Sequence, residues 1–281
     1  MKVVLLIPCL MLDNNRAANH KAMRYAKENY DVDEIVVNDQ CFSESDYEEG
    51  FTYIGHHDQR QGFVKGRNQL LEWFYNSDAD YAIWIDGNAW VSKTTLNDFR
   101  TLVDVTKRGE LPVDVVFSTL GIYVSGERIE ARKREDHREK IRLVKAQGCD
   151  WFHAMFLANL KKKYGIAPMI DERCDPNKGI SEDVYFARLL RRIVTCRQCP
   201  TIIVSKPSNK TSTWIAGKDG YKYEKIDYAT VDQIISENIK KAGWEEVKQS
   251  TKSYEYERVE AFRDMMTSYK PPKKPKGGLL K

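Results

Sequence analysis

The residues best suited to chemistry follow a short apolar run. Residues Tyr81–Ile85 are aromatic, β-branched and apolar, which predicts a buried strand, and the turn-forming Asp86-Gly87-Asn88 comes directly after it. A carboxylate at the carboxyl end of a buried strand, with glycine beside it, is typical of ligand sites in open α/β sheets. Asp86 and Asn88 are two residues apart, so both side-chain oxygens are candidate ligands of one hard cation, Mg²⁺ or Mn²⁺. The alternative is an ordinary Asp-Gly turn.

The surrounding sequence predicts strands and helices that bring this turn to the edge of a sheet. Buried strands are expected at 2–7, 34–39, 81–85, 113–118 and 201–205, and shorter strands at 53–55 and 122–124. Helices are expected at about 15–29, 62–75, 94–106, 182–192, 230–242 and 254–269, and an exposed helix or a flap at 127–145. The first two strands and the helix between them make a βαβ unit, which predicts a parallel sheet.

Composition indicates a soluble globular protein. The 281 residues are 42% hydrophobic and 11% aromatic, which suffices for a large core and excludes general disorder. Apolar runs stay shorter than the roughly 18 residues that span a membrane, so no membrane partner is expected. Within residues 1–12 a single lysine precedes the apolar run and Pro8 interrupts it, which favours a first core strand over a signal peptide.

Cysteine usage suits a reducing cytosol. The six cysteines are scattered along the chain and give no disulfide framework, so a cytoplasmic location is expected. Cys196 and Cys199 have the spacing of half a zinc site, but no second pair accompanies them. A zinc site is therefore not predicted here.

Several motifs follow one another in the order of a known enzyme family. They are the strands ending at Pro8 and Asp39, then Lys65-Gly66-Arg67-Asn68, Ile83-Trp84-Ile85-Asp86-Gly87-Asn88 and Gly179-Ile180-Ser181-Glu182-Asp183. Together they resemble the nucleotide-diphospho-sugar glycosyltransferases of the GT-A fold, those similar to family 2 and its eukaryotic mannosyltransferase relatives. The resemblance covers about residues 1–205.

The resemblance implies a fold, and the helical pattern from Tyr228 onward suggests a division of the chain. Residues 1–215 are expected to form an α/β domain of the GT-A type, Rossmann-like, with a mixed, mainly parallel sheet flanked by helices. Residues 216–281 are expected to form a helical C-terminal extension that ends in a basic, flexible tail.

The resemblance also implies transfer of a sugar from a nucleoside-diphosphate sugar to an acceptor hydroxyl, with Mn²⁺ or Mg²⁺ as cofactor. A cation on Asp86, assisted by Asn88, would stabilise the departing diphosphate, and Lys65 or Arg67 would add fixed positive charge. The residues expected to bind the nucleotide sugar are Pro8, Asp39, Lys65, Arg67, Asn68, Asp86 and Gly87. Asn88 stands where the family has an acid, and its amide brings no charge to the metal. A solvated helix face is the alternative for Lys65 and Arg67.

An acid at the start of a later helix is the expected general base. By the resemblance, Asp183 or Glu182 deprotonates the acceptor hydroxyl if the enzyme inverts configuration. The alternative is structural, because Ser181 is a good N-cap and acids in a first helical turn stabilise the helix dipole.

His153 is a further candidate metal ligand. Some members of the family use a late histidine in this way, although imidazole is a less usual partner of Mg²⁺. The alternative is a core histidine whose hydrogen bonds are satisfied within the protein.

The acceptor is the part of the function that the sequence specifies least. The segment 127–145 is rich in Lys and Arg, and the last twelve residues carry five lysines and no acid, so both could engage a phosphate backbone. In outline the chain is similar to phage enzymes that glycosylate hydroxymethylated bases in DNA, which would place it in the host cytoplasm. Interleaved acids in 127–145 favour instead an ordinary solvated helix, with a glycan or a protein as the acceptor.

Two other classes remain open. A nucleotidyltransferase shares this kind of sheet and a metal-binding aspartate, but it usually carries a glycine-rich phosphate loop after the first strand, and residues 8–15 contain no glycine. The second class is an inactive sugar-nucleotide-binding protein, which Asn88 suggests.

Overall fold

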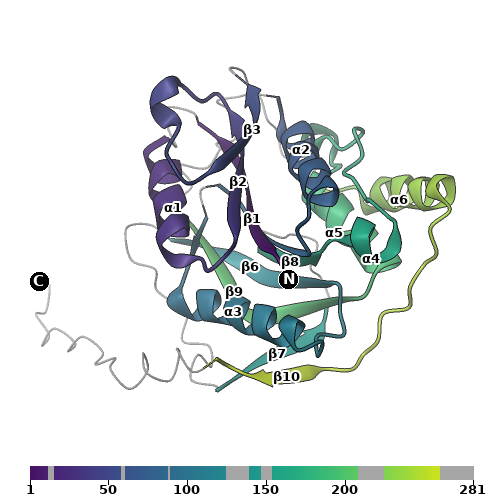
Figure 1. Ribbon diagram of the computed structural model, residues 1–281. Helices are drawn as coiled ribbons and strands as arrows, with labels where there is room; N and C mark the ends of the chain where they lie inside the picture. The colour runs from purple at the N-terminus through teal and green to yellow at the C-terminus, as the bar shows by residue number, and fades with distance from the viewer. Residues whose placement is uncertain are drawn as a thin grey trace, which may run out of the picture.

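The computed structural model describes residues 1–11, 16–57, 61–87, 89–124, 139–146, 154–207 and 225–259. A sheet with helices on both faces forms its centre (Figure 1). The strands are β1 (Val3–Leu10), β2 (Glu34–Gln40), β3 (Thr52–His57), β4 (Tyr81–Ile85), β5 (Trp90–Val91), β6 (Val115–Val124), β7 (Lys140–Lys145), β8 (Ala154–Ala158), β9 (Cys196–Pro207) and β10 (Tyr254–Glu257). The helices are α1 (Arg16–Asn29), α2 (Phe63–Asn76), α3 (Lys93–Lys107), α4 (Leu160–Tyr164), α5 (Glu182–Ile193) and α6 (Tyr228–Ala242), with 3₁₀ turns η1 (Glu44–Asp46) and η2 (Pro176–Lys178).

The sheet is mixed, with its parallel part near the N-terminus. Its order is β10-β7-β9-β6-β8-β4-β1-β2-β3, and β5 pairs with β9 beside this path. Strands β4, β1, β2 and β3 are parallel, whereas β8 runs antiparallel to both β4 and β6. The predicted βαβ unit is confirmed, because α1 connects the parallel neighbours β1 and β2. The carboxyl ends of four parallel strands therefore meet at one edge of the sheet.

The core lies on both faces of the sheet. Successive side chains of a strand point to opposite faces. Accordingly Val4 and Leu6 pack toward α2, α5 and α6, while Val3, Leu5 and Ile7 pack toward α1 and α3 (Figure 1). A strand covered on both sides must be apolar at every position, which explains the continuous apolar run at the N-terminus. Each such buried side chain contributes about 1.5–3 kcal/mol.

The predicted helix at 254–269 is wrong at its start. Tyr254–Glu257 form β10, which pairs antiparallel with β7, and β7 itself lies in the segment expected to be a helix or a flap. Alternation of tyrosine and glutamate gives the strand period, with the two tyrosines packed on the core. Across the pair, Lys140 lies 2.9 Å from Glu257 and Arg142 lies 3.6 Å from Glu255. Residues 125–138 and 260–269 of these predictions lie outside the described residues.

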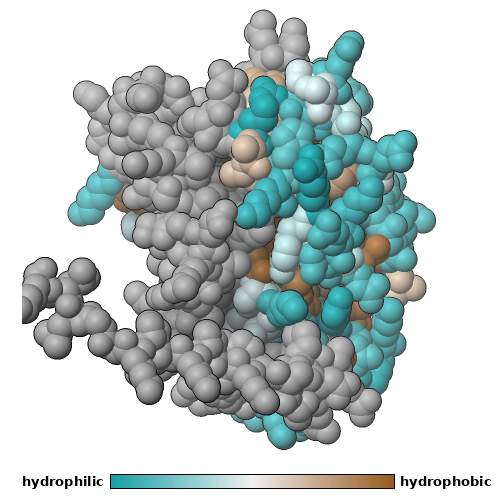
Figure 2. Space-filling view, turned by 90° about the vertical axis from the view of Figure 1, so that its left-hand side faces the viewer, coloured by the Kyte–Doolittle hydropathy of each residue, from teal (hydrophilic) through white to brown (hydrophobic). Residues whose placement is uncertain are grey.

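One face of the molecule is mainly polar among its described residues (Figure 2). Figure 2 shows mainly hydrophilic side chains among the described residues of that face, as expected for a sheet whose apolar side chains are covered by helices. Among the described helices, none is both long and apolar enough to cross a membrane.

Candidate functional site

Asp86 and Gly87 lie against the end of β1. The backbone N–H of Gly87 donates to the carbonyl of Pro8 at 3.1 Å, and the N–H of Ala89 donates to the carbonyl of Asp86 at 2.9 Å. A Cβ atom on Gly87 would lie 2.6 Å from the Pro8 oxygen, closer than real Cβ contacts allow. Glycine is therefore required for this approach of the two backbones, and the Asp86 side chain is held, buried, at the carboxyl edge of the sheet.

Arg67 brings together three acids that are far apart in the sequence. Its guanidinium comes from α2 and is buried, with 5% of the residue exposed. One guanidinium nitrogen bonds the Asp183 carboxylate and lies 3.4 Å from Glu182 Oε1, and the other lies 3.3 Å from Asp86 Oδ1. The Arg67 guanidinium thus joins the turn after β4 to the first turn of α5.

The cluster of Arg67 with these three acids is rich in negative charge. Three ionised carboxylates against one guanidinium leave a net charge of −2 on the four side chains. Glu182 is 1% exposed, and neither of its side-chain oxygens accepts a hydrogen bond from a described residue. A buried carboxylate whose charge is only partly balanced costs several kcal/mol, so this arrangement favours a further cation or a protonated group.

The start of α5 does not follow the capping interpretation in full. Ser181 occupies the N-cap position, but its hydroxyl makes no capping bond and is buried without a hydrogen-bond partner among the described residues. Glu182 and Asp183 both face the interior. Acids that only stabilise a helix dipole have no reason to leave water, because desolvation of a carboxylate is unfavourable.

Lys65 and Asn68 do not join the cluster. The Lys65 side chain points outward and donates to Gln61 Oε1 at 2.7 Å. Asn68 makes two hydrogen bonds to the backbone of Ile170, one from its Nδ2 to the carbonyl at 2.8 Å and one from the Ile170 N–H to its Oδ1 at 2.9 Å. Asn68 therefore braces the chain before α5 against α2, next to the position where Arg67 reaches α5.

Pro8 lines a pocket at this edge of the sheet. The other lining residues are Cys9, Leu10, Gln40, Gly62, Phe63 and Arg67. Gln40 accepts from the backbone N–H of Gln61 at 2.9 Å and donates to Asn38 Oδ1 at 3.0 Å, and Asn38 donates to Gln69 Oε1 at 2.8 Å. The amide side chains tie β2 to α2 beside the pocket. Asn38 and Gln40 were not predicted as site residues, although consecutive polar residues at the end of a buried strand are a signal that could have found them.

Asp39 is completely buried at the end of β2. Its Oδ2 accepts from the Tyr47 hydroxyl at 2.7 Å and lies 3.1 Å from His56 Nδ1, and its Oδ1 accepts from the His56 backbone N–H at 2.9 Å. Both oxygens of the carboxylate are thus bonded to other residues of the protein.

The metal site predicted from the sequence is described only in part. Asn88 and His153 lie outside the described residues. Within the described ranges, no group of three or more His, Cys, Asp or Glu side chains is arranged to hold a metal ion. Cys196 and Cys199 are both buried in β9, where Cys199 lies 3.3 Å from the Thr201 hydroxyl, so they give no indication of a metal site.

Asp171, in the chain before α5, is bonded by Asn238 of α6 and by Arg173. These contacts predict that the stability of the fold depends on pH. The Arg173 guanidinium bonds both oxygens of Asp171 at 2.8 and 2.9 Å, and Asn238 donates at 2.7 Å. Mainly through Arg173, the pKa of Asp171 is lowered from 3.8 to about 2. Because the folded state has the lower pKa, Asp171 stabilises the fold above pH 3.8, and this stability is lost as the pH falls toward 2.

We therefore expect Asp171→Asn to lower the free energy of unfolding by about 1–2 kcal/mol at pH 7 and by much less at pH 2. Urea unfolding at the two pH values measures both quantities. An equal loss at pH 7 and pH 2 would contradict the role given to the carboxylate charge.

Comparison with known proteins supports the fold through solved structures. No protein-family model matches the sequence, and neither does any curated protein. Residues 1–349 of S. aureus TarS in complex with UDP-GlcNAc give a TM-score of 0.51 at 15% identity, covering 85% of this chain and 66% of that one. A second structure of the same TarS fragment gives a TM-score of 0.47 at 16% identity, covering 85% of this chain and 65% of that one. Glucosyl-3-phosphoglycerate synthase from Mycobacterium tuberculosis, in complex with Mn²⁺, UDP and phosphoglyceric acid, gives 0.30 at 20% identity, covering 43% of each chain.

The chain spans just under two thirds of the TarS fragment. The similarity to the UDP-GlcNAc complex shows a shared fold, and the predicted fold class, a GT-A-like α/β fold with a mixed sheet flanked by helices, is confirmed. At this identity the comparison shows the fold alone.

Proposed function

We propose that this protein is a glycosyltransferase that moves a sugar from a nucleoside-diphosphate sugar to an acceptor hydroxyl. The observation that carries the proposal is the buried cluster of Arg67 with Asp86, Glu182 and Asp183 at the carboxyl edge of a GT-A-like sheet. The TarS structure with the same fold contains UDP-GlcNAc, which supports a UDP-sugar as the donor.

Asp86 is the residue of the cluster that would hold a divalent cation, since the three acids of the cluster are not themselves arranged as a metal site. Asp86 offers a hard oxygen ligand, and the net charge of −2 on the four side chains matches the charge of Mg²⁺ or Mn²⁺. We propose that Asp86 holds the cation, with Asn88 and His153 as the further ligands predicted from the sequence. When bound, such a cation supplies positive charge that stabilises the diphosphate leaving group.

Three side chains of the cluster have their own part in the proposed reaction. Asp183 accepts the proton of the acceptor hydroxyl as that oxygen attacks the sugar carbon. Arg67 contacts Asp86 and Asp183 at once, so it holds the donor side and the acceptor side of the reaction in a fixed arrangement before substrate binds. The close backbone contact at Gly87 keeps Asp86 at the strand end.

The acceptor stays a prediction. A hydroxymethylated base in phage DNA is suggested by the basic segment 127–145 and the lysine-rich tail, and a glycan or a protein hydroxyl is the alternative. Residues 125–138 and 260–281 lie outside the described residues. At the described end of the segment, Lys140 and Arg142 are each paired with a glutamate of β10. The division into residues 1–215 and 216–281 and the cytoplasmic location also stay predictions.

Thermal unfolding with nucleotide sugars tests the donor and the metal together. A donor present at about 100 times its Kd stabilises the folded state by about 2.7 kcal/mol. We expect UDP-GlcNAc or another UDP-sugar with Mn²⁺ to raise the Tm by several degrees, and EDTA to remove most of the rise. An unchanged Tm with every UDP- and GDP-sugar, with or without Mn²⁺, would contradict the proposed donor.

A further inference from the structure

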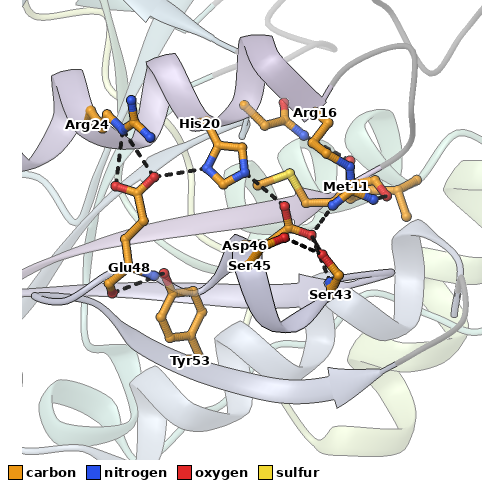
Figure 3. Close-up of polar contacts among 11 residues, drawn as sticks. Met11, Arg16, His20, Arg24, Ser43, Ser45, Asp46, Glu48 and Tyr53 are labelled. Carbon is orange, nitrogen blue, oxygen red and sulfur yellow. Dashed lines mark hydrogen bonds and ion pairs between the residues drawn. The ribbon is translucent and has the colours of Figure 1, made fainter.

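The first turn of α5 carries two acids of the cluster, but its own side chains do not fix its position. The turn η1 shows the local alternative, because Ser43 donates its backbone N–H at 2.7 Å and its hydroxyl at 2.9 Å to Asp46, three residues later (Figure 3). At α5 the corresponding residues are Ser181 and Val184. Valine has no side-chain oxygen, and the Ser181 hydroxyl makes no capping bond. Contacts from outside α5 therefore decide where this turn lies.

Asn238 of α6 supplies such a contact. Its Nδ2 donates to the Tyr185 hydroxyl at 2.8 Å and to Asp171 Oδ2 at 2.7 Å, so each amide hydrogen has an acceptor. The backbone N–H of Tyr185 donates in turn to the carbonyl of Ser181 at 2.9 Å, which closes the first turn of α5 around the two acids. Tyr185 is 1% exposed, and burial raises its pKa to about 12, so its hydroxyl stays neutral. Asn238 thus holds the residue that closes the turn.

The chain that leads into α5 is held from the same side. Arg173 donates to Glu237 of α6 at 2.6 Å, and the backbone N–H of Asp227, the N-cap of α6, donates to the Gly179 carbonyl at 3.0 Å. Gly179 has φ of 72°, and a Cβ atom there would lie 2.6 Å from the Lys225 carbonyl oxygen, so glycine is required for this close approach. The α6 helix and the residues just before it therefore contact both α5 and the chain before it.

We propose that α6 contributes to catalysis and that Asn238 is a positioning residue for Asp183. The inference rests on the proposed function, in which Asp183 accepts the proton of the acceptor hydroxyl. The helix lies beyond residues 1–205, to which the family resemblance extends.

The α5 helix lies between α2 and α6, so its first turn is held from two sides (Figure 1). Arg67 bonds the Asp183 carboxylate from α2, and Asn238 bonds Tyr185 from α6. A displacement of about 1 Å, caused by a change far from the reacting atoms, lowers a rate by up to about 100-fold. Loss of the α6 contact therefore affects the proton transfer, although Asn238 itself does not touch the acids of the cluster through its two printed bonds to Tyr185 and Asp171.

Kinetics of Asn238→Ala tests the inference with a UDP-sugar that the wild type accepts. We expect kcat for UDP release with Mn²⁺, measured per folded molecule, to fall by about 10-fold or more. The Kd of UDP with Mn²⁺, measured by calorimetry, should change little, because the contacts of Asn238 are with α5 and the chain before it. Tyr185→Phe keeps the buried ring and removes only the hydroxyl. It should lower kcat by a smaller factor, since Asn238 keeps its bond to Asp171.

Asp232→Ala is the matched control, because it removes a different contact between α5 and α6. Asp232 accepts from the Arg188 guanidinium at 2.9 and 2.5 Å, farther along α5 from the acids. We expect this change to lower the Tm and to leave kcat per folded molecule and the Kd of UDP unchanged. If Asn238→Ala lowers only the Tm, or if Asp232→Ala lowers kcat as much as Asn238→Ala does, the inference is wrong while the proposed function stands. If the wild type releases no UDP from any UDP-sugar, both are wrong.

Discussion

Replacing Asp86 by alanine is expected to lower turnover by about 1,000-fold or more, because the change removes the carboxylate proposed to hold the cation. The protein should still fold. The change removes one of three buried acids that share a single guanidinium, and Arg67 keeps its bond to Asp183. Release of UDP from the donor measures turnover, and thermal unfolding measures the fold.

Asp80→Ala is the matched control, because Asp80 lies at the other end of the same strand. Asp80 accepts from the backbone N–H of Lys2 at 2.8 Å and from Lys162 Nζ at 2.6 Å, so its loss affects the packing of β4 without reaching the cluster. We expect it to lower the Tm and to leave turnover per folded molecule unchanged. A folded Asp86→Ala protein with wild-type turnover would exclude Asp86 from the reaction.

Asp183→Asn should lower kcat by about 100-fold or more while the KM for the donor changes little. The amide has the shape of the carboxylate but takes up no proton, and Glu182 continues to interact with the Arg67 guanidinium and the helix dipole. Steady-state kinetics at varied donor and acceptor concentrations separates the two constants.

Glu182→Gln is the companion variant for this prediction. Glu182 neighbours Asp183 on α5 and is equally buried, so the pair tells which acid accepts the proton. We expect Glu182→Gln to retain clearly more turnover than Asp183→Asn. A reduced Tm with normal turnover in the Asp183 variant would instead support a purely structural role at the start of α5.

The parallel half of the sheet could be predicted because its signals are local. Short apolar runs within 2–7, 34–39 and 81–85 identify β1, β2 and β4 without knowledge of their partners, since their middle residues must be apolar on both faces. Strand β10 could not be predicted in this way. Its residues are rich in tyrosine and glutamate, and they become a strand by pairing with β7, which lies far earlier in the chain. Tertiary context decides such cases.

The sequence predicts which residues belong to the cluster better than it predicts which contacts they make. Arg67, Asp86 and Asp183 were all selected from the sequence, and the structure brings them into contact across separations of 19 and 116 residues. Lys65 and Arg67 could not both serve the site, since residues two apart on a helix face different directions. Arg67 contacts acids and Asn68 bonds the backbone of Ile170 because of the way α2 packs against the chain around α5. The sequence of α2 alone does not specify this packing.

The most direct test of the central proposal is release of UDP from UDP-sugars by the purified protein. The assay compares Mn²⁺ with EDTA, and wild type with Asp86→Ala, in the absence of any added acceptor and then with hydroxymethylated DNA or glycans. The proposed function predicts slow, Mn²⁺-dependent release with at least one UDP-sugar, which a true acceptor accelerates and Asp86→Ala eliminates. Binding of a UDP-sugar without release under any of these conditions would contradict a transferase and identify the chain as a sugar-nucleotide-binding protein.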